Sequence, residues 1–264
     1  MGSGKEGKPK RARLDDLLVA QGFAESRGQA QALILAGSVL VDDRVADKAG
    51  TPVFQSARIR VRGDHNPYVS RGGLKLRGAL EAFGLDVRNL IALDVGASTG
   101  GFTDCLLQAG AARVYALDVA YGQLAWKLRE DPRVVCIERT NIRHYEGTDL
   151  VNATDIAVID TSFISLTQVI PPVLRLLRGG AILLALVKPQ FEVKKEEVGE
   201  NGVVRDPLLH ERVLAEIEQF CRGLGLDFLG NCASPLTGPA GNREFFICAR
   251  KPPGGGGPGA NGWA

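Results

Sequence analysis

The stretch that most constrains the fold is residues 90–110, where the apolar run LIALDV is followed by GASTGG and then by the helical pattern FTDCLLQAG. A buried strand that turns through glycines into a helix presents free backbone N–H groups at the start of that helix. The turn is therefore predicted to hold a ligand. A nucleotide-like cofactor suits it, and so does a nucleophilic Ser98, because residues 96–100 also fit the pattern G-x-S-x-G.

The same alternation of strand and helix continues to residue 250. Further strands are predicted at 113–119, 134–138, 155–160 and 181–187, and helical patterns at 101–109, 122–130, 165–177 and 208–225. Two closing runs, 226–232 and 244–250, have no helix between them and are expected to form an antiparallel hairpin at the sheet edge. Strands that alternate with short helices predict an α/β fold with a Rossmann-like, doubly wound sheet.

The N-terminal part has a different pattern, which predicts a small α+β unit. Two short helices, the second capped by Ser26 and stopped by Gly37, precede a hairpin that turns at Asp42 and Asp43. The following strand carries Arg58, Arg60 and Arg62 on one face. The expected organisation is a disordered tail at 1–10, the small unit at 11–63, a linker at 64–77, the larger domain at 78–251, and a disordered tail at 252–264.

Charge is unevenly distributed between the two parts. Residues 1–77 contain 14 Lys and Arg against 8 Asp and Glu, a net charge of +6, whereas the whole chain of 264 residues carries +2. A basic segment ahead of a mildly acidic body indicates a module that binds a polyanion.

Several classes of protein are disfavoured by composition. The five cysteines are scattered without C-x-x-C or zinc spacing, which predicts reduced thiols, a cytoplasmic protein and no metal site. No apolar run approaches the ~20 residues needed to span a bilayer, so no membrane association is expected.

The glycine turn favours S-adenosylmethionine over a dinucleotide. A turn that binds a dinucleotide has the pattern G-x-G-x-x-G, whose second glycine lets the backbone approach the pyrophosphate closely. This chain has Ser98 at that position, and S-adenosylmethionine has no phosphate that would require such an approach. Asp118 ends the second strand, 22 residues after Gly96, where a carboxylate accepts hydrogen bonds from ribose hydroxyls. A hydrolase would need a later acid and histidine, and only His144 and His210 follow.

Charged residues stand where apolar strands end or begin. Asp160 closes one strand, Lys188 closes the next, and Glu244 opens the last. The carboxyl ends of parallel strands meet at one edge, and an antiparallel strand begins there, so these three side chains should converge. Lys75 precedes the sheet and is expected to fold over it from an N-terminal helix.

Both parts resemble known families. RARLDDLLVAQGFAESRGQAQALILAGSVLVDD resembles the RNA-binding domain first described in ribosomal small-subunit protein four. The set Lys75, Asp160, Lys188 and Glu244 resembles that of FtsJ-type ribose 2′-O-methyltransferases. Together with VSRGGLKL, DVGASTGGFTDCLL, ERTNIR, DTSFISL, LVKPQFE and SPLTGPAGNREFF, it resembles the TlyA family, historically named haemolysins.

The resemblance implies S-adenosylmethionine-dependent 2′-O-methylation of cytidine in ribosomal RNA, with ribosomal subunits as partners. The implied catalytic residues are the four just named. The implied cofactor residues are Asp94, Gly96, Ala97, Ser98, Gly100, Gly101, Phe102, Asp118 and Asn141. The implied RNA-binding residues are Arg11, Arg13, Arg27, Gln31 and Arg71.

Some questions stay open at this point. Lys188 either takes the proton or orients the hydroxyl, because Lys75 favours a neutral amine and the two acids favour an ammonium. Asn141 either meets the adenine edge or caps a turn, and Phe163 and Phe191 either stack on a base or pack in the core. The rival functions are a non-catalytic RNA-binding factor and a membrane-lytic protein; the first would not need Asp118 or the catalytic set, and the second would need a membrane-active segment.

Overall fold

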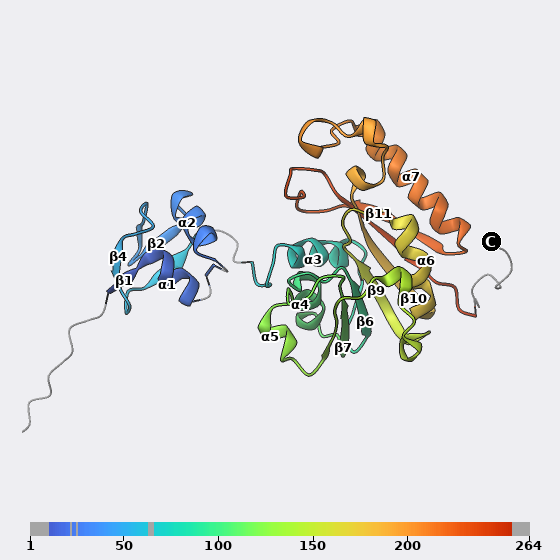
Figure 1. Ribbon diagram of the computed structural model, residues 1–264, viewed down its shortest axis with the longest axis horizontal. Coiled ribbons are helices and arrows are strands. Elements are labelled where there is room, and N and C mark those ends of the chain that lie inside the picture. The colour runs from blue at the N-terminus through green and yellow to red at the C-terminus, as the bar shows by residue number, and fades with distance from the viewer. Residues whose placement is uncertain (1–10, 22, 25, 63–65, 255–264) are drawn as a thin grey trace, which may run out of the picture. The chain divides into compact units, whose positions relative to one another are not determined.

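The computed structural model describes residues 11–21, 23–24, 26–62 and 66–254, which form two compact units divided between residues 65 and 66 (Figure 1). The predicted tail at 1–10 and residues 255–264 of the other tail lie outside the described residues. Each unit is described by itself.

The first unit packs two short helices against small antiparallel sheets. Its elements are β1 (Arg11–Arg13), α1 (Leu14–Ala20), α2 (Arg27–Leu35), β2 (Val39–Val41), β3 (Arg44–Val45), β4 (Pro52–Phe54) and β5 (Ile59–Val61). β2 lies between β3 and β5, and β1 pairs with β4. Leu14, Leu18, Ile34 and Val39 are fully buried between helices and strands. This burial provides the core that so small a unit needs.

Local signals in this unit are confirmed. The Ser26 hydroxyl accepts a hydrogen bond from the Gln29 N–H and caps α2. Asp42 and Asp43 both have positive φ, as a two-residue turn between β2 and β3 requires. Strand β1 is a correction, since the sequence predicted no strand before α1; only its partner β4, 40 residues later, makes it one.

The second unit is a seven-stranded sheet with helices on both faces. Its strands are β6 (Ile91–Val95), β7 (Arg113–Leu117), β8 (Val134–Ile137), β9 (Thr154–Ile159), β10 (Leu177–Val187), β11 (Asp227–Ala233) and β12 (Phe245–Arg250), in the order β11-β12-β10-β9-β6-β7-β8. Strands β6 to β10 are parallel, and β12 is antiparallel to β10 and β11. This confirms the predicted Rossmann-like sheet and the closing hairpin.

Each strand supplies two hydrophobic cores, because successive side chains point to opposite faces. One core joins the sheet to α3 (Gly72–Ala82), α4 (Gly101–Gln108) and α5 (Trp126–Arg129). The other joins it to α6 (Leu166–Leu176) and α7 (Pro207–Gly223). Within β9, Ile156 and Val158 belong to the first core, and Ala157 and Ile159 to the second. Both sheet faces are therefore covered, as a parallel sheet requires.

Helix α3 corrects the predicted linker. The predicted linker included residues 72–77, yet these residues form the first half of α3, and Leu76 is fully buried. Glycines permit close packing of α3 and α4, because a Cβ on Gly101 would lie 2.9 Å from the Gly73 nitrogen.

Two other boundaries differ from the prediction. The helix expected at 122–130 is limited to α5, because Gly122 has a positive φ and the residues after it contact the glycine turn. Gln123 accepts from the Ser98 hydroxyl, and the Ala125 N–H donates to the Thr99 carbonyl. β10 begins at Leu177 rather than Ala181, with an irregularity between Leu177 and Ile182 where Gly180 has positive φ. Leu177 pairs with Thr154 of β9 ahead of this irregularity, and that contact between residues remote in the chain extends the strand beyond the predicted start.

Candidate active site

The turn between β6 and α4 has a backbone that most residues cannot adopt. Gly96 and Gly100 have φ values of +87° and +97°, and Ser98 lies between them at +48°. A Cβ on Gly96 would lie 2.7 Å from the Asp160 carbonyl oxygen, and one on Gly100 would lie 2.3 Å from a Leu128 methyl. The glycines are needed for conformation and for close approach of neighbouring chain.

Asp118 lies at the rim of this turn, directly after β7. Its Oδ2 accepts the Ser98 N–H at 2.7 Å, and its Oδ1 accepts the Ala120 N–H at 2.7 Å. The carboxylate is half-buried and fixed in orientation, with acceptor capacity left on each oxygen. It therefore holds the turn in shape and faces solvent beside it.

The serine-hydrolase alternative has no assembled triad. The Ser98 hydroxyl contacts Gln123 Oε1 at 3.3 Å. His210 lies on α7, where its Nε2 contacts the Val204 carbonyl oxygen at 2.9 Å and its ring packs against Phe245. Each of these two side chains is engaged elsewhere, so His210 does not serve Ser98 as a base.

The four predicted catalytic residues come together as two ion pairs. Lys75 on α3 donates to Glu244 Oε2 at 2.6 Å. Lys188 Nζ lies 2.6 Å from Asp160 Oδ1, outside hydrogen-bond geometry, and donates to the Ser162 hydroxyl at 2.9 Å. The lysines and Glu244 are buried, and 22% of the Asp160 side chain is exposed. Each amine thus faces a carboxylate at the carboxyl edge of the sheet.

One pocket connects the glycine turn to both ion pairs. It has a volume of about 230 Å³, and both Lys75 and Asp160 line it. Lys188 and Glu244 contact these two lining residues. The other lining residues are Ser70, Arg71, Gly72, Gly96, Ala97, Ser98, Thr99, Gly101, Phe102, Thr237 and Pro239. The site therefore combines residues from α3, the turn, the end of β9 and the loop between β11 and β12.

Asp94, the last acid before the turn, is fully buried. Thr103 donates to its Oδ2 at 2.7 Å, and its Oδ1 has no partner. Burial raises the pKa of Asp94 to about 7, and the neighbouring charges of Asp160 and Asp118 act in the same direction. Asp94 therefore lies beneath the turn as a carboxyl group with an unusually high proton affinity.

Ser162 is a site residue that sequence reasoning missed. It accepts the Lys188 hydrogen bond, and the signal was its place two residues after Asp160 in DTSF.

The next residue, Phe163, is 88% exposed, and its ring centroid lies 5.0 Å from that of Phe191. Core packing is thus wrong for Phe163.

Two further predicted residues have other contacts. Asn141 Oδ1 accepts the Arg143 N–H and caps a short 3₁₀ helix (Ile142–His144), which is the turn-capping alternative. Arg71 lines the pocket and lies within 3.5 Å of the Thr237 carbonyl oxygen, with its side chain exposed.

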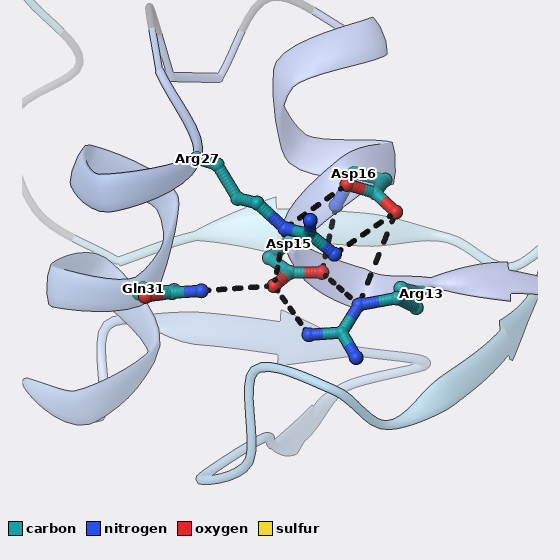
Figure 2. A network of polar contacts seen from close by, with 5 residues as sticks. All are labelled: Arg13, Asp15, Asp16, Arg27 and Gln31. Carbon is teal, nitrogen blue, oxygen red and sulfur yellow. Dashed lines mark hydrogen bonds and ion pairs between the residues drawn. The ribbon is translucent and has the colours of Figure 1, made fainter.

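The predicted RNA-binding residues of the first unit all contact other side chains of that unit, and three of the four contact one acid. Arg13, Arg27 and Gln31 all donate to Asp15 (Figure 2). Arg11 stacks over the Phe54 ring, 4.3 Å from its centroid. The sequence did not indicate the Asp15 network, because Arg27 and Gln31 lie 12 and 16 residues from Asp15 in the chain.

Comparison with known proteins gives consistent matches over both units. The FtsJ-like methyltransferase family matches residues 68–251, and the S4 domain matches residues 12–59. The chain is 48% identical to the 16S/23S rRNA (cytidine-2′-O)-methyltransferase TlyA of Mycobacterium tuberculosis, over 91% of this chain and 90% of that protein. It is 40% identical to Hemolysin A of Brachyspira hyodysenteriae, over 89% and 98%. A solved structure from Streptococcus thermophilus, described as a hemolysin, aligns with a TM-score of 0.72 at 42% identity, over 93% and 90%.

The fold, the site and these matches define the class: an FtsJ-like methyltransferase that carries an S4 RNA-binding domain. The alignments with these rRNA methyltransferases extend over about nine-tenths of the chain and include both units. The chain belongs to the TlyA family of rRNA methyltransferases. Despite the haemolysin names in this family, none of the helices in the described ranges is long and apolar enough to cross a membrane.

Proposed function

We propose that this protein transfers the methyl group of S-adenosylmethionine to the 2′-hydroxyl of a cytidine in ribosomal RNA, within ribosomal subunits in the cytoplasm. The observation that carries the proposal is the pair of buried Lys–carboxylate contacts next to the glycine-turn pocket. A non-catalytic RNA-binding factor has no use for such charges, which are costly to bury.

The donor fits the residues of the turn. The turn residues that line the pocket are Gly96, Ala97, Ser98, Thr99 and Gly101. Asp160 also lines it, and its carboxylate suits a cationic sulfonium. Pockets for whole ligands are typically roughly 300–1,000 Å³, so the pocket of about 230 Å³ takes part of the donor. The remainder extends over the rim, where the half-buried Asp118 accepts hydrogen bonds from the ribose hydroxyls. Asn141 follows β8; its Oδ1 caps the 3₁₀ helix, and we assign its side-chain NH₂ to the adenine end.

The donor supplies an already activated methyl group, so this chain must align the acceptor oxygen and manage its proton. Lys188 is the residue we assign to the 2′-hydroxyl, held by Asp160 and Ser162. As the O–CH₃ bond forms, the S–CH₃ bond of the donor breaks and S-adenosylhomocysteine leaves. The hydroxyl proton passes either to Lys188 in its neutral form or to water while the Lys188 ammonium holds the oxygen. Lys75, held by Glu244, lines the same pocket and positions the ribose or its phosphate. Alignment of reacting atoms contributes much of the acceleration.

The acceptor nucleotide requires a surface outside the pocket. Exposed Phe163, with Phe191 beneath it, offers a face on which an unstacked base can lie. Arg71 at the pocket mouth carries a charge for the adjoining phosphate. The S4 domain supplies a second RNA contact through its basic residues.

Incubation of the protein with methyl-labelled donor and separated ribosomal subunits tests the proposal. We expect label in one cytidine, or one cytidine per subunit, with the adjacent phosphodiester resistant to alkaline cleavage, because that cleavage needs a free 2′-hydroxyl. Label on a base, or RNA binding without label in either subunit or in free ribosomal RNA, would contradict it. The second result would favour the RNA-binding factor.

A further inference from the structure

The first unit contains a carboxylate whose acceptor capacity is fully used. Asp15 is completely buried at the start of α1. Its Oδ1 accepts from Arg13 Nε and the Asp16 N–H, and its Oδ2 accepts from Arg13 Nη2, Arg27 Nε and Gln31 Nε2, all at 2.8–3.1 Å. A carboxylate has about four lone-pair sites, so Asp15 is saturated. Two guanidinium groups from distant positions are thereby fixed side by side, as Figure 2 shows.

The two arginines are only partly used by this anchor. Each guanidinium has five N–H donors, and Asp15 engages two from Arg13 and one from Arg27. About half of each arginine side chain is exposed, 48% for Arg13 and 52% for Arg27. Asp15 therefore leaves the guanidinium pair facing solvent with capacity for a second anion.

Asp16 supplies a second anion from within the chain, and its contacts are looser. Its carboxylate lies 3.3 Å from Arg27 Nε, 3.4 Å from Arg27 Nη2 and 3.9 Å from Arg13 Nε. The Asp16 side chain is 51% exposed, unlike that of Asp15. Exposed pairs of this kind are worth ~0–1 kcal/mol. Asp16 thus bridges the same two guanidiniums from outside and is the more easily displaced acid.

We propose that Arg13 and Arg27 form a site for an RNA phosphate, in which Asp15 is the positioning residue and Asp16 is a built-in competitor that the phosphate displaces. The proposal rests on the RNA-binding role in the proposed function. It adds that two adjacent acids, Asp15 and Asp16, have opposite effects on RNA affinity. A phosphodiester bridging both guanidiniums makes charge-assisted hydrogen bonds that Asp16 makes only loosely. Asp16 therefore lowers RNA affinity, and Asp15 raises it.

Binding of the full chain to purified ribosomal RNA, measured over a series of KCl concentrations, tests this inference. Asp16→Asn should tighten binding about two- to fivefold, as expected for removal of one weak ion pair. Asp15→Asn changes the net charge equally but should weaken binding, because an amide NH₂ would face the donors of Arg27 and Gln31. Arg27→Gln should weaken binding and flatten the salt dependence by about one phosphate contact.

The matched control is Asp43→Asn, which removes another exposed acid of the same unit that also pairs with an arginine, Arg60, at 3.2 Å. Asparagine accepts the positive φ of that turn position. The proposal is overturned if Asp16→Asn does not raise RNA affinity, or if Asp43→Asn raises it equally. It is also overturned if Asp16→Asn raises RNA affinity as much in the Arg27→Gln background as in the unaltered chain. If Asp15→Asn unfolds the unit, the Asp16 and Arg27 comparison decides alone.

Methyl transfer by the unaltered chain is measured separately. Loss of the methyl-transfer result with the binding pattern intact contradicts the proposed function only. Methyl transfer with no difference between Asp16→Asn and Asp43→Asn contradicts this inference only.

Discussion

Lys75 Nζ lies 2.6 Å from Glu244 Oε2, and both side chains are buried although 169 positions separate them in the chain. The contact joins α3, which comes before the first strand of the sheet in the chain, to the start of β12, which is the last strand in the chain. Lys75 and Asp160 both line the glycine-turn pocket, so each of the two ion pairs contributes one residue to its lining.

Breaking this contact from one side should cost more than removing it altogether. Glu244→Gln leaves the Lys75 ammonium buried without a counter-charge, and loss of one partner of a buried pair typically costs about 3–5 kcal/mol. The double variant Lys75→Met with Glu244→Gln should recover at least part of that loss in urea unfolding of the full chain. A double variant less stable than Glu244→Gln alone would show that the pair is not a coupled unit.

Lys188→Ala should abolish methyl transfer and retain donor binding. The residue faces the acceptor rather than the donor in our proposal, and a positioned base contributes roughly 10²–10⁴-fold. Single-turnover transfer and calorimetric donor binding measure the two effects separately. Lys127→Ala is the control, since Lys127 pairs with Asp104 at 2.9 Å in the same unit. Equal transfer rates in Lys188→Ala and the unaltered chain would remove Lys188 from the mechanism.

Asp118→Ala should weaken donor binding. The substitution removes the carboxylate that holds Ser98 and Ala120 and that we assign to the ribose. Hydrogen bonds to charged groups are worth roughly 1.5–3 kcal/mol, so the dissociation constant should rise about 10- to 100-fold. Asp131→Ala, which removes an acid that pairs with Arg133, should leave it unchanged. An unaltered constant for Asp118→Ala would refute the ribose assignment.

Gly96→Ala should destabilise the second unit and prevent donor binding. The new methyl would meet the Asp160 carbonyl oxygen at 2.7 Å, at a φ of +87°. Gly84→Ala is the matched control: its φ is +60°, and no atom lies within 4 Å of the added methyl. Gly84→Ala should show only the backbone strain of about 1–3 kcal/mol, with normal donor binding. Equal effects of the two substitutions on donor binding would show that the close approach to Asp160 is unimportant.

Asp94 should make the stability of the second unit fall as pH rises. Its pKa is about 7 in the folded chain against an ordinary 3.8, so the folded state binds the extra proton between about pH 4 and pH 7. The stabilisation from this proton is complete below pH 4 and lost by about pH 7. Asp94→Asn should flatten the difference between urea unfolding at pH 5 and at pH 8.

Asp86→Asn is the control for Asp94, because hydrogen bonding to Arg88 lowers the pKa of Asp86 to about 2, outside this pH window. An unchanged pH difference in Asp94→Asn would assign the effect to another group.

Much of the second unit was predictable because its signals are local. The apolar run 155–160 has the length and bounds of a buried parallel strand, and β9 occupies 154–159. The topology rule that strand ends meet at one edge was enough to bring Asp160 and Lys188 together. By contrast, the start of α3 was misread, because Gly72 and Gly73 have the composition of a loop and the packing of a helix.

The sequence by itself determined the division into two units, the order of strands and helices from β6 onward, and the glycine turn, since all of these follow from periodicity and from residues that few backbones tolerate. Only the tertiary structure decided the partner of each charged side chain: Glu244 for Lys75, and the Ser162 hydroxyl for Lys188. It also showed that Asp15 contacts Arg13 and Arg27, which the sequence assigned to RNA alone. An ion pair depends on distances of a few ångströms between side chains remote in the chain, and no local pattern of residues carries that information.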